Sequence, residues 1–432
     1  MLQKLKDKIK NRLRSMLGIS QLEEVLERRD QMLKNASDLL LREANTFGLP
    51  LRVLFLVYDM RVWNALDAVY RMMKDDDDFT VIVAVVADDE RGVTCLEDNQ
   101  RAIEALGIEY FILGNQTADL NYLKTLKLHV IVRQYPWQDA YPDIYRPYNL
   151  QFARICYIPY ALSIVQFETV DYWKMEMMRA SWLVFKPQWL LAENNENIYA
   201  SVENPFYPVG YPKFESIVKS RASWPIESGA RKFRMIWSPH NSISENWTWL
   251  QFGTFLENYQ DFLAFAQAQQ ERVEIVLAAH PHFMERIESV TSVATQTKVR
   301  RFFAEWQALP NTAIHQESSY GGIFHASDLL ITDGISWLME YQLMQKPIIF
   351  IERADHWPFT NFGNTMIEAV HAYPTFPQAK EKILSFMHGE KDEKLALMQR
   401  NRAAIYEEGA AQKIVQAIKE RYLAEVKRKR LE

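Results

Sequence analysis

Short runs of consecutive apolar residues alternate with helical stretches along most of this chain, and this alternation constrains the fold more than any other feature. Unbroken runs rich in Val, Ile and Leu are typical of strands covered on both faces of a parallel sheet. We expect ten such strands, at 52–57, 80–86, 110–113, 128–132, 154–158, 182–185, 234–237, 274–279, 329–332 and 348–351. The helical stretches between them predict the crossovers of an α/β fold.

The expected strands fall into two groups. Residues 214–231, which separate the groups, mix Ser, Pro, Gly and charged residues, as linkers do. At 432 residues the chain is also too long for one ordinary core. We therefore predict two Rossmann-like domains, at 49–215 and 232–390, with a helical N-terminal extension, 1–48, and C-terminal helices, 391–432. No Gly-x-Gly-x-x-Gly motif follows the first strand, so the dinucleotide fingerprint is absent.

The composition narrows the class of protein. Charged residues at 24% and hydrophobic residues at 48% are typical of a soluble globular protein. The net charge of -5 argues against a nucleic-acid binder. Cys95 and Cys156 lie in apolar stretches, which predicts buried, reduced thiols in a cytoplasmic protein. No apolar run approaches the roughly 20 residues of a membrane helix, and no secretory signal is recognisable.

Two helical segments precede the first strand, and each leaves two interpretations open. Residues 1–18 have apolar positions at helical spacing surrounded by Lys and Arg, so they either lie on an anionic membrane surface or pack on the protein itself. Residues 22–44 have a heptad-like spacing that fits either a short coiled coil, hence a homodimer, or one helix packed on the first domain. Arg29 interrupts the seam and favours the second interpretation.

Polar side chains follow three strands of the second group, at the point where each strand ends. They are Ser238, His240, Asn241 and Ser242, then His280 and His282, then Asp333, Gly334 and Ser336. Carboxyl ends of parallel strands share one edge of a sheet, where ligands bind. A histidine there can accept a proton from an alcohol or contact a diphosphate, and the first amides of a helix favour an anion. No Cys or carboxylate cluster accompanies His280 and His282, so we predict no metal site.

The sequence around these strand ends also resembles that of a known protein family. WSPHNSI, FGTFLENY, AAHPHF, SDLLITDGISWLMEY and KPIIFIE occur in this order, and the series resembles the CDP-glycerol glycerophosphotransferase family of teichoic-acid-like polymer synthesis. The likeness spans about residues 200 to 370, and GYPKFE at 210–215 is similar to the family's step into its second domain. The first domain agrees more loosely, through VLFLV, Trp63 and CYIPYAL.

The resemblance implies a GT-B fold, two Rossmann-like domains facing across a cleft, with the nucleotide in the second domain and the acceptor facing the first. Members move glycerol phosphate, or a related polyol phosphate, from a CDP carrier onto a hydroxyl. By position, His240 and His280 match the family's two functional histidines, one of them a general base. Asp333 and Ser336 match its phosphate corner, and Glu340 the acid one turn later, which would hold ribose hydroxyls. The chain departs from the pattern at Gly334 and Ile335, where one hydroxyl is lost.

We therefore predict a cytoplasmic transferase, peripheral on the inner membrane face, that moves a polyol phosphate from CDP-glycerol or a similar donor onto a cell-surface glycan or lipid-linked acceptor. The predicted site has catalytic His240 and His280, donor contacts at Asn241, Ser242, His282, Asp333, Gly334, Ser336 and Glu340, acceptor contacts at Arg133 and Tyr160, and neither metal nor cofactor. Two alternatives stay open: a GT-B glycosyltransferase of surface polysaccharide synthesis that uses a nucleotide sugar, and an inactive scaffold subunit.

Overall fold

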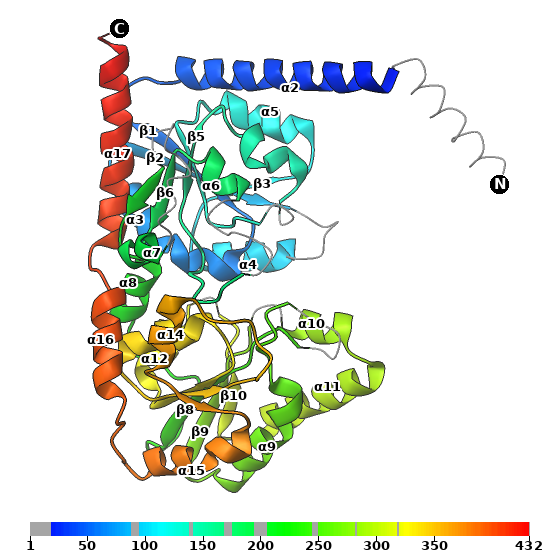
Figure 1. Ribbon diagram of the computed structural model, residues 1–432, viewed down its shortest axis with the longest axis vertical. Coiled ribbons are helices and arrows are strands. Elements are labelled where there is room, and N and C mark those ends of the chain that lie inside the picture. The colour runs from blue at the N-terminus through cyan, green and yellow to red at the C-terminus, as the bar shows by residue number, and fades with distance from the viewer. Residues whose placement is uncertain are drawn as a thin grey trace, which may run out of the picture.

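The computed structural model describes residues 19–87, 95–137, 141–167, 175–193, 205–243, 249–280, 283–317 and 319–431. Within these ranges the chain forms two sheets that follow one another along the long axis of the molecule, with helices packed around each (Figure 1). The first sheet uses residues 51–208 and the second uses residues 233–373.

Seven strands form the first sheet, in the order β3-β2-β1-β4-β5-β6-β7, and all neighbouring pairs are parallel. The strands are β1 (Leu51–Val57), β2 (Phe79–Val86), β3 (Phe111–Leu113), β4 (Val130–Arg133), β5 (Arg154–Tyr157), β6 (Leu183–Lys186) and β7 (Phe206–Pro208). The order reverses between β1 and β4, which makes that pair the topological switch point.

Six parallel strands form the second sheet, in the order β10-β9-β8-β11-β12-β13. They are β8 (Phe233–Ser238), β9 (Val273–Leu277), β10 (Thr312–Ile314), β11 (Leu329–Thr332), β12 (Ile348–Ile351) and β13 (His371–Tyr373). The order reverses between β8 and β11. Both sheets thus have the Rossmann-like arrangement, and the predicted fold class is confirmed.

Helices connect and cover the strands. Before and around the first sheet are α2 (Ile19–Ala44), η1 (Met60–Ala65), α3 (Asp67–Lys74), α4 (Leu96–Ala105), α5 (Thr117–Thr125), η3 (Asp143–Tyr145), η4 (Pro147–Asn149), α6 (Glu176–Ala180) and α7 (Gln188–Glu193). After them come α8 (Pro212–Lys219), α9 (Phe255–Ala268), α10 (Phe283–Val290), α11 (Val293–Ala308), α12 (Gly321–Ala326), α13 (Ser336–Glu340), η6 (Tyr341–Met344), α14 (Asn361–Ile367), α15 (Phe376–Met387), α16 (Leu395–Ile405) and α17 (Ala410–Lys429).

Burial on both faces explains why β1 reads as an unbroken apolar run. Val53, Phe55 and Val57 pack on one face of the sheet, and Leu54 and Leu56 pack on the other. All five side chains are completely buried. Each contributes about 1.5–3 kcal/mol relative to an exposed position, so a polar residue at any of them would destabilise the first core.

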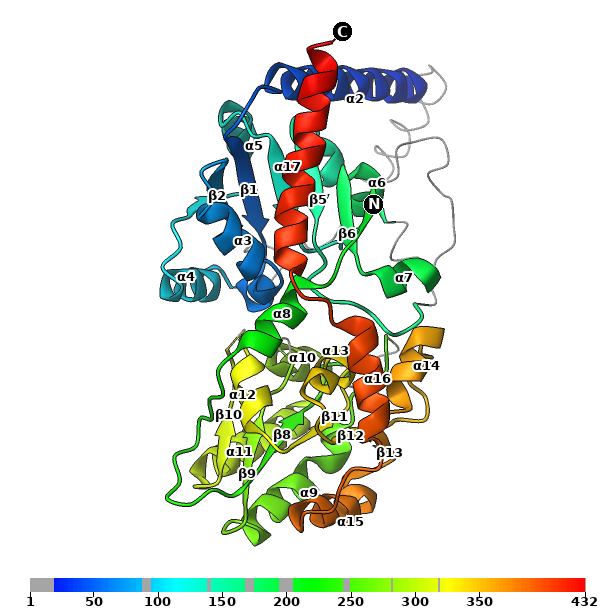
Figure 2. The ribbon, with the colours of Figure 1, turned by 90° about the vertical axis from the view of Figure 1, so that its left-hand side faces the viewer.

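The C-terminal helices do not form a layer of their own. Met398 and Ile405 of α16 pack in the core of the second domain, whereas Ile414, Ile418 and Tyr422 of α17 pack in the core of the first. Figure 2 shows the two helices running along the two domains in turn. The chain therefore returns to the first sheet after completing the second.

The predicted linker, 214–231, is in part a helix. Phe214 and Ile217 of α8 are buried in the second core, because the apolar face of this short helix packs beside α12. Gly210, just before α8, lies against the chain that returns to the first domain. A Cβ at this position would stand 2.7 Å from Cβ of Glu407, so only glycine fits where the two interdomain passages cross.

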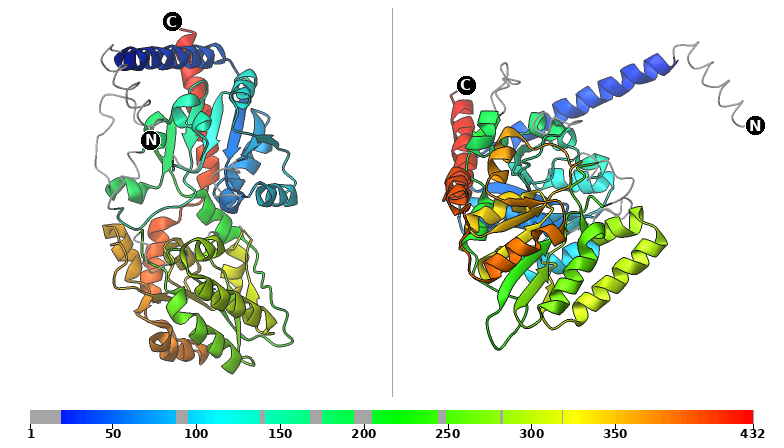
Figure 3. Two further views of the ribbon diagram at one scale, coloured as in Figure 1. Left: turned by 90° about the vertical axis from the view of Figure 1, so that its right-hand side faces the viewer. Right: turned by 60° about the horizontal axis from the view of Figure 1, so that its bottom comes forward.

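Helix α2 contacts the first domain with one face only. Lys34 donates to Asn149, and Lys124 pairs with Asp38 at 2.5 Å, while Met32 and Leu40 are 72% and 70% exposed. The N-terminal half of α2 projects beyond the first domain (Figure 1 and Figure 3). The homodimer stays a prediction, and residues 1–18 lie outside the described residues.

The two cysteines differ in their surroundings. Cys156 is buried in β5, and burial raises the pKa of its thiol. Cys95 directly precedes α4 and is exposed, because it belongs to neither core cluster of the first domain, so the prediction of two buried thiols was wrong for Cys95. None of the helices within the described ranges combines the length and the apolar character needed to cross a membrane.

Candidate functional site

Three strand ends meet at one edge of the second sheet, on either side of its switch point. β8 lies between β9 and β11, and Ser238 at the end of β8 pairs with Thr332 at the end of β11. The rings of His240 and His280, which follow β8 and β9, have centroids 5.7 Å apart. The structure therefore brings together both predicted catalytic histidines, beside the corner that begins at Asp333.

Asp333 holds this edge together. Its Oδ1 accepts from the backbone N–H of His240 at 2.5 Å, and its Oδ2 accepts from the backbone N–H and the hydroxyl of Thr254 at 2.5 and 2.8 Å. Burial raises the pKa of Asp333 to about 7, although the three donors act in the opposite direction.

Asp333 is predicted to contact the donor, but in the structure its carboxylate contacts other groups of the protein. The residue is only 2% exposed, and both of its oxygens already accept hydrogen bonds from within the protein. It is a positioning residue that ties the loop after β8 and the start of α9 to β11. Thr254 was missed, although it stands directly before a helix, where hydroxyl residues are common.

His240 is nearly enclosed. Only 7% of the residue is exposed, and burial lowers its pKa to about 4, so the ring is neutral near pH 7. Its Nδ1 lies 2.8 Å from the hydroxyl of Ser242 and 3.1 Å from the backbone nitrogen of Ser242. Ser242 was predicted to contact the donor, but it is buried at 3% exposure and binds this ring instead.

His280 is half-buried, and both its backbone N–H and its backbone carbonyl form hydrogen bonds. Its N–H donates to the carbonyl of Pro239 at 3.1 Å, and its carbonyl accepts from Phe283 at 2.8 Å. The loops after β8 and β9 are therefore joined beside the two rings. Asn241 is half-buried next to His240, and His282 lies outside the described residues.

The corner between β11 and α13 has donors that suit an anion. Gly334 donates to the hydroxyl of Thr332 at 2.8 Å, which closes the turn. Ser336 is the first residue of α13 and half-buried, and within the described ranges its hydroxyl has no hydrogen-bond partner. The first amides of a helix have no intrahelical acceptor, so they and Ser336 are available to a phosphate.

Glu340 is predicted to hold ribose hydroxyls, but in the structure its carboxylate is engaged within the protein. It is 1% exposed, its Oε1 lies 2.8 Å from Nζ of Lys213, and its Oε2 accepts from the hydroxyl of Tyr320. Glu340 is one turn beyond Ser336, but this face of the helix points into the protein toward α8. The residue forms a buried ion pair that anchors α13.

Breaking this ion pair is expected to be costly. Lys213→Met should lower the free energy of unfolding by about 3 kcal/mol, because the buried carboxylate of Glu340 then lacks its cation. The double variant Lys213→Met/Glu340→Leu should regain most of that loss, because no charge stays buried. Urea denaturation measures both. Lys219→Met, at an exposed lysine of the same helix, is the control and should cost clearly less, because the ammonium of Lys219 is solvated. A double variant no more stable than Lys213→Met would contradict this account.

The two predicted acceptor residues differ. Arg133 is 1% exposed, donates to the carbonyl of Tyr145 at 2.8 Å, and has its guanidinium carbon 3.8 Å from the ring centre of Tyr141. It is enclosed by its own domain, so the prediction of an acceptor contact is corrected. Tyr160 is half-buried, stacks on Tyr135 at 4.8 Å, and its hydroxyl accepts from Nε1 of Trp137 at 3.1 Å.

Aromatic side chains continue from Tyr160 into the second domain. The Trp137 ring lies 6.0 Å from Phe167 and 6.5 Å from Trp249, and Trp249 lies 4.6 Å from Trp357. Phe167 belongs to a segment that bridges the domains, where Val165 pairs with Phe359. The high aromatic content of 13% was the only signal of this cluster in the sequence.

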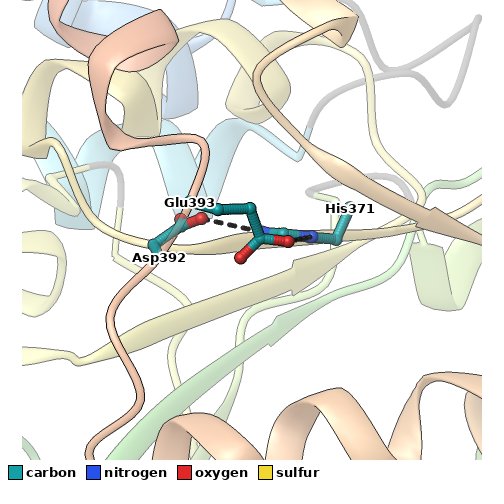
Figure 4. A group of neighbouring side chains, drawn as sticks. All are labelled: His371, Asp392 and Glu393. Atoms are coloured by element: carbon teal, nitrogen blue, oxygen red, sulfur yellow. Dashed lines mark hydrogen bonds and ion pairs between the residues drawn. The ribbon is translucent and has the colours of Figure 1, made fainter.

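A histidine and two acids gather elsewhere, at the start of β13. Nε2 of His371 lies 2.9 Å from Asp392, and Nδ1 lies 3.7 Å from Glu393, so the two ring nitrogens face different acids (Figure 4). Glu393 also pairs with Lys382 at 2.8 Å. Lys382 already neutralises one of the two acids, and the start of a strand lies at the opposite end of the sheet from the histidine pair. This group is therefore a hydrogen-bonded cluster and not part of the candidate site.

Comparisons with known proteins show likeness of fold. No family model and no curated protein matches the sequence. Among solved structures, the wall teichoic acid polymerase TagF is similar, with a TM-score of 0.56 at 12% identity over 94% of this chain and 99% of that one. S. aureus MnaA in complex with UDP is similar with a TM-score of 0.56 at 11% identity, covering 87% of this chain and 97% of that one. UDP-GlcNAc 2-epimerase from Neisseria meningitidis, bound to UDP-GlcNAc, has a TM-score of 0.51 at 12% identity, covering 85% and 99%.

Proposed function

We propose that this chain is a transferase that moves glycerol phosphate, or a related polyol phosphate, from a CDP-linked donor onto a hydroxyl of a cell-surface glycan or teichoic-acid-like acceptor. The observation that carries the proposal is the meeting of His240 and His280, 5.7 Å apart, beside the donor-rich start of α13 at the switch point. The motif series and the likeness in fold to a teichoic acid polymerase support it.

In the proposed reaction one of the two histidines accepts the proton of the acceptor hydroxyl. The oxygen attacks the β-phosphorus of the donor, the bond from that phosphorus to the CMP oxygen breaks, and CMP leaves with the electron pair. The imidazolium later returns its proton to water. Ser336 and the amides of residues 335–337 stabilise the phosphate charge that develops. These steps require no tightly bound metal.

The remaining contacts follow from position. Asn241 and His282 contact the donor, and Gly334 shapes the corner. Tyr160 and the aromatic side chains around it face the acceptor, since they follow strands of the first sheet. Residues 1–18 attach the protein to the anionic inner face of the cell membrane, and α2 provides a homodimer contact.

The competing function is a GT-B glycosyltransferase that moves a sugar, and the likeness in fold to UDP-bound proteins favours keeping it. Incubation with CDP-glycerol, CDP-ribitol, UDP-GlcNAc and GDP-mannose, with and without acceptor glycan, separates the two. Acceptor-dependent release of CMP is the expected result. Release of UDP or GDP with transfer of a sugar would overturn the proposal. No release from any donor, with cellular function intact after His240→Ala and His280→Ala, would support the scaffold instead.

A substitution at Ile335 tests whether the donor is a CDP-polyol. If the donor is a CDP-polyol, Ile335→Ser should leave kcat/KM for CDP-glycerol unchanged or raise it, because a hydroxyl is restored beside the phosphate corner. Steady-state kinetics with CDP-glycerol measures this, and Ile335→Val is the matched control for loss of the larger side chain. A clear loss with Ser but not with Val would mean that this corner binds something else.

A further inference from the structure

We infer that Ser242 fixes His240 in the tautomer that carries its proton on Nε2, so that His240 is a neutral hydrogen-bond donor to a phosphate oxygen and not the general base. This inference rests on the proposed function and assigns separate roles to its two histidines. Ser242 is then a positioning residue, and the role of the base passes to His280.

The evidence begins at Nδ1 of His240. The backbone N–H of Ser242 donates to Nδ1 at 3.1 Å, and a backbone N–H can only donate. Nδ1 must therefore present its lone pair. A neutral imidazole has a single N–H, so the proton is on Nε2.

The hydroxyl of Ser242 gives the same answer independently. Its Oγ accepts from the backbone N–H of Phe252 at 2.8 Å and of Gly253 at 2.9 Å, which occupies both lone pairs. The hydroxyl can therefore only donate its hydrogen, and the nearby acceptor is Nδ1 of His240 at 2.8 Å. Two donors thus converge on Nδ1, and neither arrangement tolerates a proton there.

The other side of the ring has the features of a ligand contact. Within the described ranges no group accepts from Nε2. The ring of His280 lies 5.7 Å from the ring of His240, measured between their centroids. An unpartnered N–H next to the phosphate corner is suited to donate to an oxygen that gains charge during transfer.

The same arrangement excludes His240 as a base. Its Nε2 already holds a proton, and protonation at Nδ1 would break both bonds to Ser242. Burial also lowers the pKa of the ring to about 4, so a neutral donor persists at working pH. A neutral histidine that polarises its substrate while another group moves the proton is an established division of labour in enzymes. His280, half-buried and adjacent, is the remaining histidine of the described pair.

The tautomer can be measured directly by NMR on the full chain labelled with ¹⁵N-histidine. The His240 signals, assigned from their loss in His240→Gln, should show a protonated Nε2 and a bare Nδ1 between about pH 6 and pH 8. Two histidines are internal references. His129 accepts from the backbone N–H of Arg52 at Nδ1, and His388 accepts from the guanidinium of Arg272 at Nε2 at 3.0 Å, so they represent the two opposite tautomers. A His240 spectrum like that of His388 would overturn the inference.

Variants at Ser242 separate the tautomer from the proposed reaction. Ser242→Ala removes one of the two donors to Nδ1 and leaves the backbone N–H at 3.1 Å, so the share of the Nδ1-protonated tautomer should rise and kcat should fall at least about tenfold. Ser242→Thr keeps the hydroxyl and should restore both. Addition of CMP should shift the Nε2–H signal of the wild type. If the Nε2 tautomer is present but CMP leaves it unshifted, the proposed donor site is wrong and the tautomer stands. If Ser242→Ala keeps a single Nε2 tautomer and full kcat, the role given to Ser242 is wrong.

Discussion

Replacing His280 with Gln is expected to lower kcat for acceptor-dependent CMP release by about 10²–10⁴-fold, the usual contribution of a general base. The reason is the division between the two rings: Ser242 binds Nδ1 of His240, which leaves His280 to accept the proton. Gln keeps much of the size and hydrogen-bonding capacity of the side chain, so the Kd for CMP should change only a few-fold. Initial-rate kinetics at saturating donor and acceptor, together with calorimetric titration of CMP, measures both quantities.

A matched control for this experiment lies elsewhere on the second domain. His388, exposed after α15 and hydrogen-bonded to Arg272, takes the same replacement, and His388→Gln should keep full activity. His240→Gln should also lose activity, but without the change in the pH profile that loss of a base produces. If His280→Gln remains active while His240→Gln removes the basic limb of the pH profile, the roles of the two histidines are reversed.

The architecture was predictable because it depends on patterns that are local in sequence. Each of the ten expected strands occurs, and the boundaries at 329–332 and 348–351 are those observed. The strands that were missed, β7, β10 and β13, have three residues each and lie toward or at the sheet edges. Phe206–Pro208 and His371–Tyr373 include exposed or polar positions, so they lack the continuous apolar run of a central strand.

The position of the candidate site was predictable for a similar reason, but the direction of its side chains was not. Parallel pairing necessarily gathers the strand ends that carry His240, His280 and Asp333 at one edge. What each group contacts depends on residues far along the chain. Asp333 is engaged by Thr254, 79 residues away, and Glu340 by Lys213, 127 residues away. No periodicity in the sequence encodes such partners.

The packing of α17 on the first sheet has the same origin. The C-terminal helices were predicted, but either of the two domains could have buried the apolar face of α17. The choice follows from the passage at Gly210 and Glu407, where the returning chain lies against the outgoing one. A helix pattern specifies which face is buried and leaves the partner open.

Asp333→Ala is expected to lower the free energy of unfolding by at least about 3 kcal/mol. The variant leaves three buried donors without an acceptor, the N–H of His240 and the N–H and hydroxyl of Thr254, and each unsatisfied donor costs about 1–3 kcal/mol. Urea denaturation followed by tryptophan fluorescence measures the loss. Asp355→Ala is the control, because its carboxylate is 55% exposed and pairs with Arg353, and it should cost less than about 1 kcal/mol. Equal losses in the two variants would mean that Asp333 does not hold the strand ends together.

The pH dependence of stability gives a sharper test, because Asp333 and His240 titrate in opposite senses within nearly the same interval. Burial raises the pKa of Asp333 from 3.8 to about 7, so its contribution is present below about pH 4 and lost as pH rises through 7. Burial lowers the pKa of His240 from 6.5 to about 4, so its contribution is present above pH 6.5 and lost as pH falls through 4. In the wild type the two dependences largely cancel.

Single variants should expose each dependence in turn. Relative to the wild type, His240→Gln should gain roughly 3 kcal/mol as pH falls from about 6.5 to 4, because only the wild type must keep a buried neutral imidazole against protonation. Relative to the wild type, Asp333→Asn should instead gain stability as pH rises from about 4 to 7, because only the wild type must keep a buried carboxyl protonated while its unfolded chain ionises. Denaturation midpoints at several pH values measure both differences. If both stability differences are flat across this pH interval, neither group is desolvated. That result would contradict the assignment of His240 as a neutral hydrogen-bond donor.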